Sequence, residues 1–208
     1  MFQSCFEIIE QVFIKNDGSG NFQLIVNMSK SRSRLNSIMK MKKVNGHDVP
    51  TKDEMSQKIA DIERVFIKTP GINNVKKSID FDNYIFTLSC NFTSVTKLNT
   101  VVKAIKENEN DKTNINEQFY AWDNITKTFT RLNKNSFKKE YQKLSNADKE
   151  VFSSANFTTI FKFESAIASA SNKEANLSSN KKAVMLKMNL LDLVTDKKSI
   201  ENKINLTK

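Results

Sequence analysis

The stretch FEIIEQVFIKNDGSGNFQLIVNM, residues 6–28, decides the fold. Apolar side chains recur at every second position in each half, and the turn sequence Asp17-Gly18-Ser19-Gly20 separates the halves. Alternate side chains of a strand share one face, so the pattern predicts a β-hairpin with one apolar face. Glu10 interrupts the first apolar row, which predicts a bulge or a sheet edge there. The rows consist of Phe6, Ile8, Val12 and Ile14, then Phe22, Leu24, Val26 and Met28.

Two later segments carry apolar residues at helical spacing. Thr51-Lys52-Asp53-Glu54 is a capping box, in which Thr51 accepts from a backbone amide and Glu54 reaches back. The helix that follows carries one apolar stripe, predicted to be buried against the sheet, and residues 69–71 end it. Its stripe is Met55, Ile59, Ile62 and Phe66, and a second helix after Ser94 carries Val95, Leu98, Val101, Val102 and Ile105. Shorter helices are expected within residues 31–43 and 136–152, the latter as one broken helix or two.

Further strands are predicted where apolar residues again alternate. These are residues 74–92 as two paired strands, a hairpin within 119–132, residues 157–163 and 183–189, and a closing edge strand around Ile204 and Leu206. The strands come mostly as hairpins with helices between them, and not in regular strand–helix alternation. We therefore predict an α+β fold, with a largely antiparallel sheet and helices packed on one face, and treat residues 6–208 as a single domain.

The composition makes the surface basic without naming a partner. The 208 residues include 33 basic and 23 acidic side chains, for a formal charge of +10. Such a surface attracts phosphates, anionic lipid headgroups and acidic polymers. The abundance of Lys, Asn, Ile and Phe is also typical of an AT-rich genome. Arginine, which proteins favour for bidentate contacts to guanine and phosphate, occurs four times, so nucleic-acid binding is the weaker hypothesis.

The sequence offers little for catalysis, metal binding or cofactor binding. Two cysteines and a single histidine are too few for a disulfide framework or a zinc cluster. The four glycines fall in turns, so they do not form a phosphate-binding loop. His47 lies in a predicted turn, where Asp48 could orient it, and we expect a solvated side chain there. Cys90 falls on the apolar side of its strand and is interpreted as a small buried hydrophobe. We expect no catalytic residue, metal or cofactor, and hence no enzyme.

The first five residues resemble the end of a lipoprotein signal. Ser4 precedes Cys5, and Phe2 occupies the apolar position three residues before it, as in a lipobox. The charged region and the roughly 7–15-residue apolar stretch of a secretory signal are missing from the printed sequence. Either the start codon lies further upstream or the chain was cut near the processing site; otherwise Cys5 is an ordinary residue of a cytosolic protein. We predict that residues 1–5 are a lipobox remnant and that Cys5 is the acylated mature N-terminus.

The segment Cys5–Val12, the turn at 17–20 and the strand after it resemble small lipoproteins of unassigned function from Bacteroidota, of the Flavobacteria type. They are more loosely similar to the mycobacterial LppM-like lipoprotein domain. The likeness in motifs covers about the first thirty residues, and the rest of the chain is similar as a pattern of elements. The resemblance implies a lipoprotein of the bacterial envelope, anchored in the outer membrane through Cys5 and facing the periplasm or the cell surface.

Three functions follow as hypotheses. The first is a non-enzymatic, membrane-anchored module that binds a ligand, envelope proteins, or anionic polymers and lipids. The second is a cytosolic module that binds nucleic acid through a basic segment. The third and weakest is a hydrolase that uses His47. The basic segment of the second hypothesis contains Lys30, Arg32, Arg34, Lys40, Lys42 and Lys43.

Overall fold

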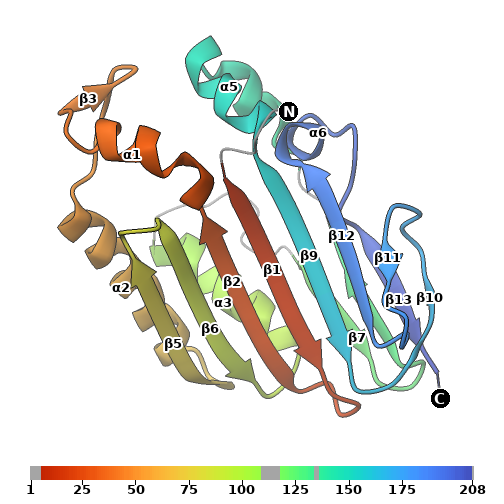
Figure 1. Cartoon of the computed structure of the whole chain (residues 1–208). Helices are drawn as coiled ribbons and strands as arrows, with labels where there is room; N and C mark the ends of the chain where they lie inside the picture. The colour runs from red at the N-terminus through yellow and green to blue at the C-terminus, as the bar shows by residue number, and fades with distance from the viewer. Residues whose placement is uncertain (1–5, 109–117, 134–135, 208) are drawn as a thin grey trace.

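The computed structural model describes residues 6–108, 118–133 and 136–207, which form a large seven-stranded sheet and a smaller one (Figure 1). The strands of the large sheet are β1 Glu7–Ile14, β2 Gly20–Asn27, β5 Ile72–Asp80, β6 Ile85–Phe92, β9 Asn156–Phe163, β11 Asn176–Leu177 and β12 Ala183–Asn189. They lie in the order β11-β12-β9-β1-β2-β6-β5. β1 and β9 run parallel, and the other neighbours are antiparallel.

The smaller sheet has four antiparallel strands, in the order β10-β13-β8-β7. Its strands are β7 Tyr120–Asp123, β8 Thr128–Arg131, β10 Ile167–Ala170 and β13 Asn202–Leu206, and a separate short hairpin consists of β3 Lys43–Val44 and β4 His47–Asp48. The helices are α1 Arg32–Ile38, preceded by a 3-10 turn at Ser29–Ser31, α2 Lys52–Lys68, α3 Thr96–Asn108, α4 Lys138–Lys143, α5 Asn146–Ser153 and α6 Leu190–Val194.

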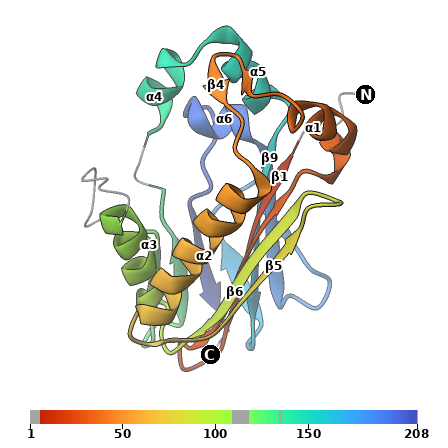
Figure 2. The same ribbon diagram turned by 90° about the vertical axis from the view of Figure 1, so that its left-hand side faces the viewer.

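Two layers share one face of the large sheet. Helices α2 and α3 cover the half formed by β2, β6 and β5, and the small sheet lies behind the half formed by β1, β9 and β12 (Figures 1 and 2). One apolar cluster joins all three, with Phe66 and Leu98 from the helices and Phe129 from the small sheet. Phe129 packs on Phe161 of β9, with 4.9 Å between ring centroids. The predicted α+β fold with helices on one face is therefore confirmed, and the second sheet is an addition to it.

Local sequence signals set several element boundaries. The predicted capping box begins α2: the amide of Glu54 donates to Thr51 Oγ1 at 3.2 Å, and Glu54 Oε2 accepts from the amide of Thr51 at 2.7 Å. α2 ends before Pro70, and Gly71 follows at a φ of +86°, which a glycine adopts without strain. Ser145 caps α5, so residues 136–152 hold two short helices. The predicted hairpins 6–28 and 119–132 are also confirmed.

Two predictions about strand edges are wrong. Glu10 causes no bulge, because β1 pairs in unbroken register with β2 and β9, and Glu10 lies opposite Leu24 and Thr159. β1 is also an inner strand of its sheet. The last strand, β13, is no edge either, since it lies between β10 and β8. In both cases the partner strand is distant in sequence, and a local pattern does not reveal it.

Two helix predictions need correction as well. The helix expected within residues 31–43 ends at Ile38, and the β3–β4 hairpin follows it. The stripe on α2 is buried only at its end: Phe66 is 5% exposed, whereas Met55, Ile59 and Ile62 are half-buried. The N-terminal part of α2 is therefore less tightly packed on the sheet than its C-terminal part.

A buried ion pair joins the two sheets. Glu10 of β1 accepts two hydrogen bonds from Arg131 of β8, Nε to Oε1 and Nη2 to Oε2, both at 2.9 Å. The two side chains are 5% and 8% exposed. Such a paired, bidentate geometry lets two charges lie between apolar layers, because each oxygen and N–H group has a partner.

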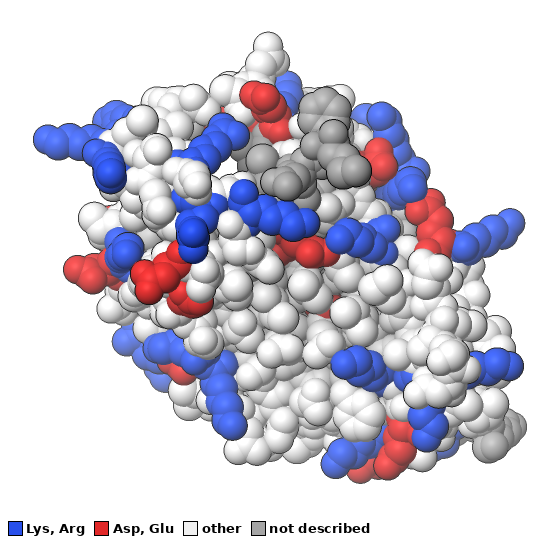
Figure 3. Space-filling view, in the orientation of Figure 1, with Lys and Arg blue, Asp and Glu red and all other residues white. Residues whose placement is uncertain are grey.

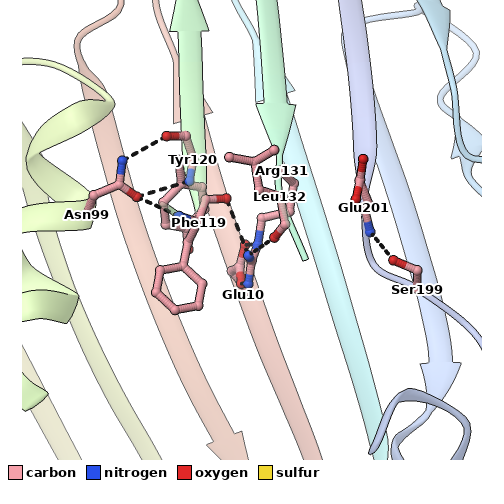
Figure 4. A network of polar contacts seen from close by, with 8 residues as sticks. All are labelled: Glu10, Asn99, Phe119, Tyr120, Arg131, Leu132, Ser199 and Glu201. Carbon is pink, nitrogen blue, oxygen red and sulfur yellow. Dashed lines mark hydrogen bonds and ion pairs between the residues drawn. The ribbon is translucent and has the colours of Figure 1, made fainter. Parts of the chain in front are cut away.

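Neighbouring groups hold this ion pair in place (Figure 4). Arg131 also donates to the carbonyl of Leu132 at 2.7 Å, and its guanidinium carbon lies 4.9 Å from the ring centre of Tyr120. Asn99 of α3 accepts from the amides of Phe119 and Tyr120 at 2.9 and 3.0 Å. Burial, and next the charge of Glu10, raise the pKa of Tyr120 well above its ordinary value, so its hydroxyl stays protonated. The network thus links α3, both sheets and the loop before β7.

Replacing Arg131 with Met should lower the free energy of unfolding by about 3–5 kcal/mol, because Glu10 then stays buried without its partner. Urea denaturation measures the change. The matched control is Lys198→Met, which breaks the exposed 2.8 Å ion pair with Glu174 and should leave the free energy of unfolding nearly unchanged, because solvent screens such a pair. Equal losses in the two variants would contradict a structural role for the buried pair.

Candidate functional site

An open apolar groove lies between α2 and the large sheet. Two adjoining hollows form it, and Ile62 lines both. The outer hollow, of about 270 Å³, is lined by Val26, Met55, Lys58, Ile59, Ile62 and Phe86. The inner hollow, of about 180 Å³, continues toward α3, and its lining includes Phe22, Leu24, Phe66, Leu98, Val101 and Tyr120. We call these two hollows together the α2 groove.

The α2 groove exists because the stripe on α2 is incompletely covered. Phe66 packs against Phe22, with ring centroids 6.4 Å apart, and anchors the C-terminal half of the helix. Met55 and Ile59, nearer the N-terminus, stay half-exposed above Val26 and Phe86 of the sheet. Their spacing predicted a buried face, and helical spacing does not distinguish a packed stripe from one that borders a groove. The spacing of the apolar residues therefore does not reveal this groove.

Positive charge gathers at the outer end of the α2 groove. Lys58 is the charged residue in the lining of the outer hollow. Helix α1 lies at the same end of the sheet: it follows β2, and Asn36 accepts a 2.8 Å hydrogen bond from the hydroxyl of Tyr84, which directly precedes β6. Residues 28–43 contain six basic and no acidic residues. All six, namely Lys30, Arg32, Arg34, Lys40, Lys42 and Lys43, are exposed.

His47 is the first residue of β4, directly after the turn that was predicted to contain it, and it is solvated as predicted, with a side chain 72% exposed. The predicted partner Asp48 is wrong: Asp48 pairs with Lys43 at 3.4 Å, and His47 Nε2 lies 3.4 Å from Asp148 Oδ2 instead. Ser145 Oγ donates to the same oxygen at 2.7 Å and, with a contribution from His47, lowers the pKa of Asp148. The carboxylate thus lies between serine and imidazole, whereas a catalytic triad needs the imidazole in contact with the serine hydroxyl.

The remaining predictions concern the two cysteines, a metal site and a membrane-spanning helix. Cys5, the predicted lipidation site, lies outside the described residues. Within the described ranges, no group of three or more His, Cys, Asp or Glu side chains could hold a metal ion. No helix in the same part of the chain combines the length and apolar character needed to cross a membrane. Cys90 is 2% exposed in the core, as its position in the strand predicted.

Comparisons with known proteins find a loose structural similarity to one solved domain. No protein-family model matches the chain, and no curated protein matches it. The NMR structure of the folded domain of LppM from Mycobacterium tuberculosis is similar at a TM-score of 0.48 and 12% identity, over 99% of this chain and 92% of that one. The expected resemblance to the LppM-like domain is thus found as a loose structural similarity. The expected likeness to Bacteroidota lipoproteins stays a prediction.

The thiol of Cys90 should be inert in the folded protein. Burial raises its pKa to about 12, so at pH 8 it is protonated as well as covered. In a Cys5→Ser variant, which leaves Cys90 as the single thiol, Ellman's reagent should react at once in denaturant and, without denaturant, no faster than the protein unfolds. Rapid reaction of the native variant at pH 8 would contradict this placement of Cys90.

Proposed function

We propose that this chain is a non-enzymatic binding module, held at a bacterial envelope membrane through acylated Cys5, whose α2 groove takes the acyl chain of an anionic amphiphile. The observation that carries the proposal is the α2 groove itself. Its outer hollow is walled by apolar side chains, is open to solvent and has Lys58 at its rim. Apolar lining with few, well-placed polar groups is typical of small-molecule sites.

The shape of the groove favours a flexible chain as its occupant. Ile62 lines both hollows, so they adjoin at this side chain, and the inner one lies beneath both α2 and α3. An acyl chain could enter the outer hollow and continue inward, whereas an amphipathic helix, roughly 10 Å wide, would be too broad for the inner one. Each buried methylene contributes about 0.8 kcal/mol, and the half-exposed side chains of Met55 and Ile59 would lose contact with water at the same time.

The charge at the outer end favours an anionic headgroup. Lys58 borders the outer hollow, and the basic segment 28–43 lies at the same end of the sheet. Lysine and arginine side chains attract anionic lipid headgroups, and each contributes about 1 kcal/mol close to a membrane surface. Segment 28–43 would therefore bind the anionic headgroup, and the α2 groove would bind the acyl chain.

The position of the predicted anchor supports the same arrangement. Cys5 lies two positions before Glu7 in the sequence, and Glu7, the first residue of β1, pairs with Asn27, the last residue of β2. The basic segment follows Asn27 directly. An acyl anchor on Cys5 would therefore hold segment 28–43 and the outer end of the α2 groove toward the membrane. The nucleic-acid hypothesis uses the same basic segment but leaves the groove without a role.

Laurate, a single-chain anionic amphiphile, should bind to the full chain below its micelle concentration, as measured by isothermal titration calorimetry. Ile59→Gln places a polar group in the outer hollow and should weaken binding about tenfold or more. Ile67→Gln is the matched control, since Ile67 is 59% exposed on the same helix and lies outside the groove lining. Uncharged monolaurin should bind more weakly than laurate, and Lys58→Gln should reduce the difference. Equal binding by the two isoleucine variants would refute the groove as the site.

The predicted anchor is tested separately by cell fractionation. In the native host, the full-length gene product should appear in the membrane fraction, and Cys5→Ser should move it to the soluble fraction because the acyl chains are lost. Cys90→Ala is the matched control and should leave the protein in the membrane fraction. Mass spectrometry of the native protein should find a mass increase from acyl groups on Cys5. An unchanged distribution of Cys5→Ser would refute the anchor without bearing on laurate binding.

A further inference from the structure

The outer face of the large sheet has an uncharged centre. No described element covers this face along β1, β2 and β6, which lies opposite α2 and α3 (Figure 2). Three successive rows of outward side chains on these strands carry no charge, and Lys and Arg gather toward the border of the face (Figure 3). The rows consist of Ile9, Ile25 and Thr87, then Gln11, Gln23 and Ser89, then Phe13, Asn21 and Asn91. Because 27% of the residues in the chain are charged, a region of outward side chains without any charge differs from an ordinary solvated surface.

A hollow of about 390 Å³ lies on this face beside β5. Its lining consists of the polar residues Gln11, Asn21, Gln23, Ser89 and Asn91 together with Phe22 and Cys90, and Asn74 and Lys76 stand at its side. The β5–β6 register shifts between Asn73 and Lys76, and Asn74 has a φ of +50°. A bulge of this kind locally disrupts the pairing and redirects side chains. We call the site the amide hollow.

The polar groups of the amide hollow are mostly free to bind a ligand. Gln11 Nε2 donates to Gln23 Oε1 at 3.2 Å, which holds these two side chains next to each other. Within the described part of the chain, the side chains of Asn74, Ser89 and Asn91 form no hydrogen bond to other protein groups. An amide offers two N–H donors and a carbonyl acceptor without net charge. The hollow therefore presents a dense set of neutral donors and acceptors.

We propose that the amide hollow binds a neutral saccharide. A sugar hydroxyl both donates and accepts, so neighbouring hydroxyls can pair with the donor and acceptor of one amide. Phe13, half-exposed and opposite Asn21 in the sheet, offers an apolar surface for the C–H face of a sugar ring. The volume lies within the range of about 300–1,000 Å³ that small-molecule sites occupy.

Other ligand classes fit the amide hollow less well. An anionic ligand calls for several cations, and Lys76 is the one charged residue of the lining. A protein partner calls for an apolar centre with a polar rim, and here the lining itself is mostly polar. The α2 groove is a different site on the opposite face of the sheet, because Leu24 lines only the groove and Gln23 only the hollow, although Phe22 borders both. The two sites can therefore be tested independently.

The test is an NMR titration of the isotope-labelled full chain with neutral disaccharides at millimolar concentrations, using cellobiose, maltose, mannobiose and diacetylchitobiose as probes. At least one should shift the side-chain amide signals of Gln11, Gln23 and Asn91. Asn91→Leu should weaken its binding about tenfold or more. The matched control is Ser78→Ala, on the same face of β5 but outside the hollow, which should bind as the wild type does. Gln23→Leu provides a second variant, and both Leu variants should keep wild-type laurate binding if they are folded.

Three outcomes would overturn the proposal. The first is the absence of a localised shift with every disaccharide. The second is binding that is lost with added salt and in Lys76→Gln, which would identify an anionic ligand instead. The third is a dimer, detected by sedimentation, that Asn91→Leu dissociates, which would make the face an interface between two copies of the chain.

Discussion

The buried ion pair between Glu10 and Arg131 is the constraint on which the arrangement of layers depends. A carboxylate in the middle of an inner strand is tolerated only with a well-placed partner, because its burial without one costs several kcal/mol. Arg131 supplies that partner from the small sheet, with two hydrogen bonds of 2.9 Å. The pairing requires β8 to lie opposite the centre of β1. The small sheet therefore has one position over the large sheet, and the helices occupy the remaining half of the face.

This division of the inner face explains the α2 groove. Over β1 and β9, aromatic side chains such as Phe129 and Phe161 interdigitate and fill the space between the sheets. Over β2 and β6, helix α2 packs closely at Phe66 but leaves Met55 and Ile59 half-exposed. Tyr120 belongs to both regions: its ring centre lies 4.9 Å from the guanidinium carbon of Arg131, and it also lines the inner hollow. The closed polar network thus forms one end of the open apolar groove.

Strand β2 contributes to both candidate binding sites, because its side chains alternate between the two faces. Phe22 and Leu24 line the α2 groove, and Asn21 and Gln23 line the amide hollow on the opposite face. A strand with one apolar and one neutral polar row can present different chemistry to ligands on its two faces. The basic segment then continues from the end of this strand, so charge, apolar groove and amide hollow are all arranged around β2.

The sequence by itself determined the local elements and the absence of any recognisable catalytic motif. The hairpin at 6–28, the capping box at Thr51 and the alternation in 157–163 depend on neighbouring residues, and each appears in the structure as expected. Tertiary structure alone decided the parallel pairing of β1 with β9, the second sheet, the partner of Glu10 and the incomplete burial of α2. Tertiary structure also decided that Gln11, Gln23 and Asn91 line one hollow beside the irregular part of β5. The physical reason is that periodicity and capping act within a few residues, whereas the fit between surfaces involves segments more than a hundred residues apart, and no local pattern records that fit.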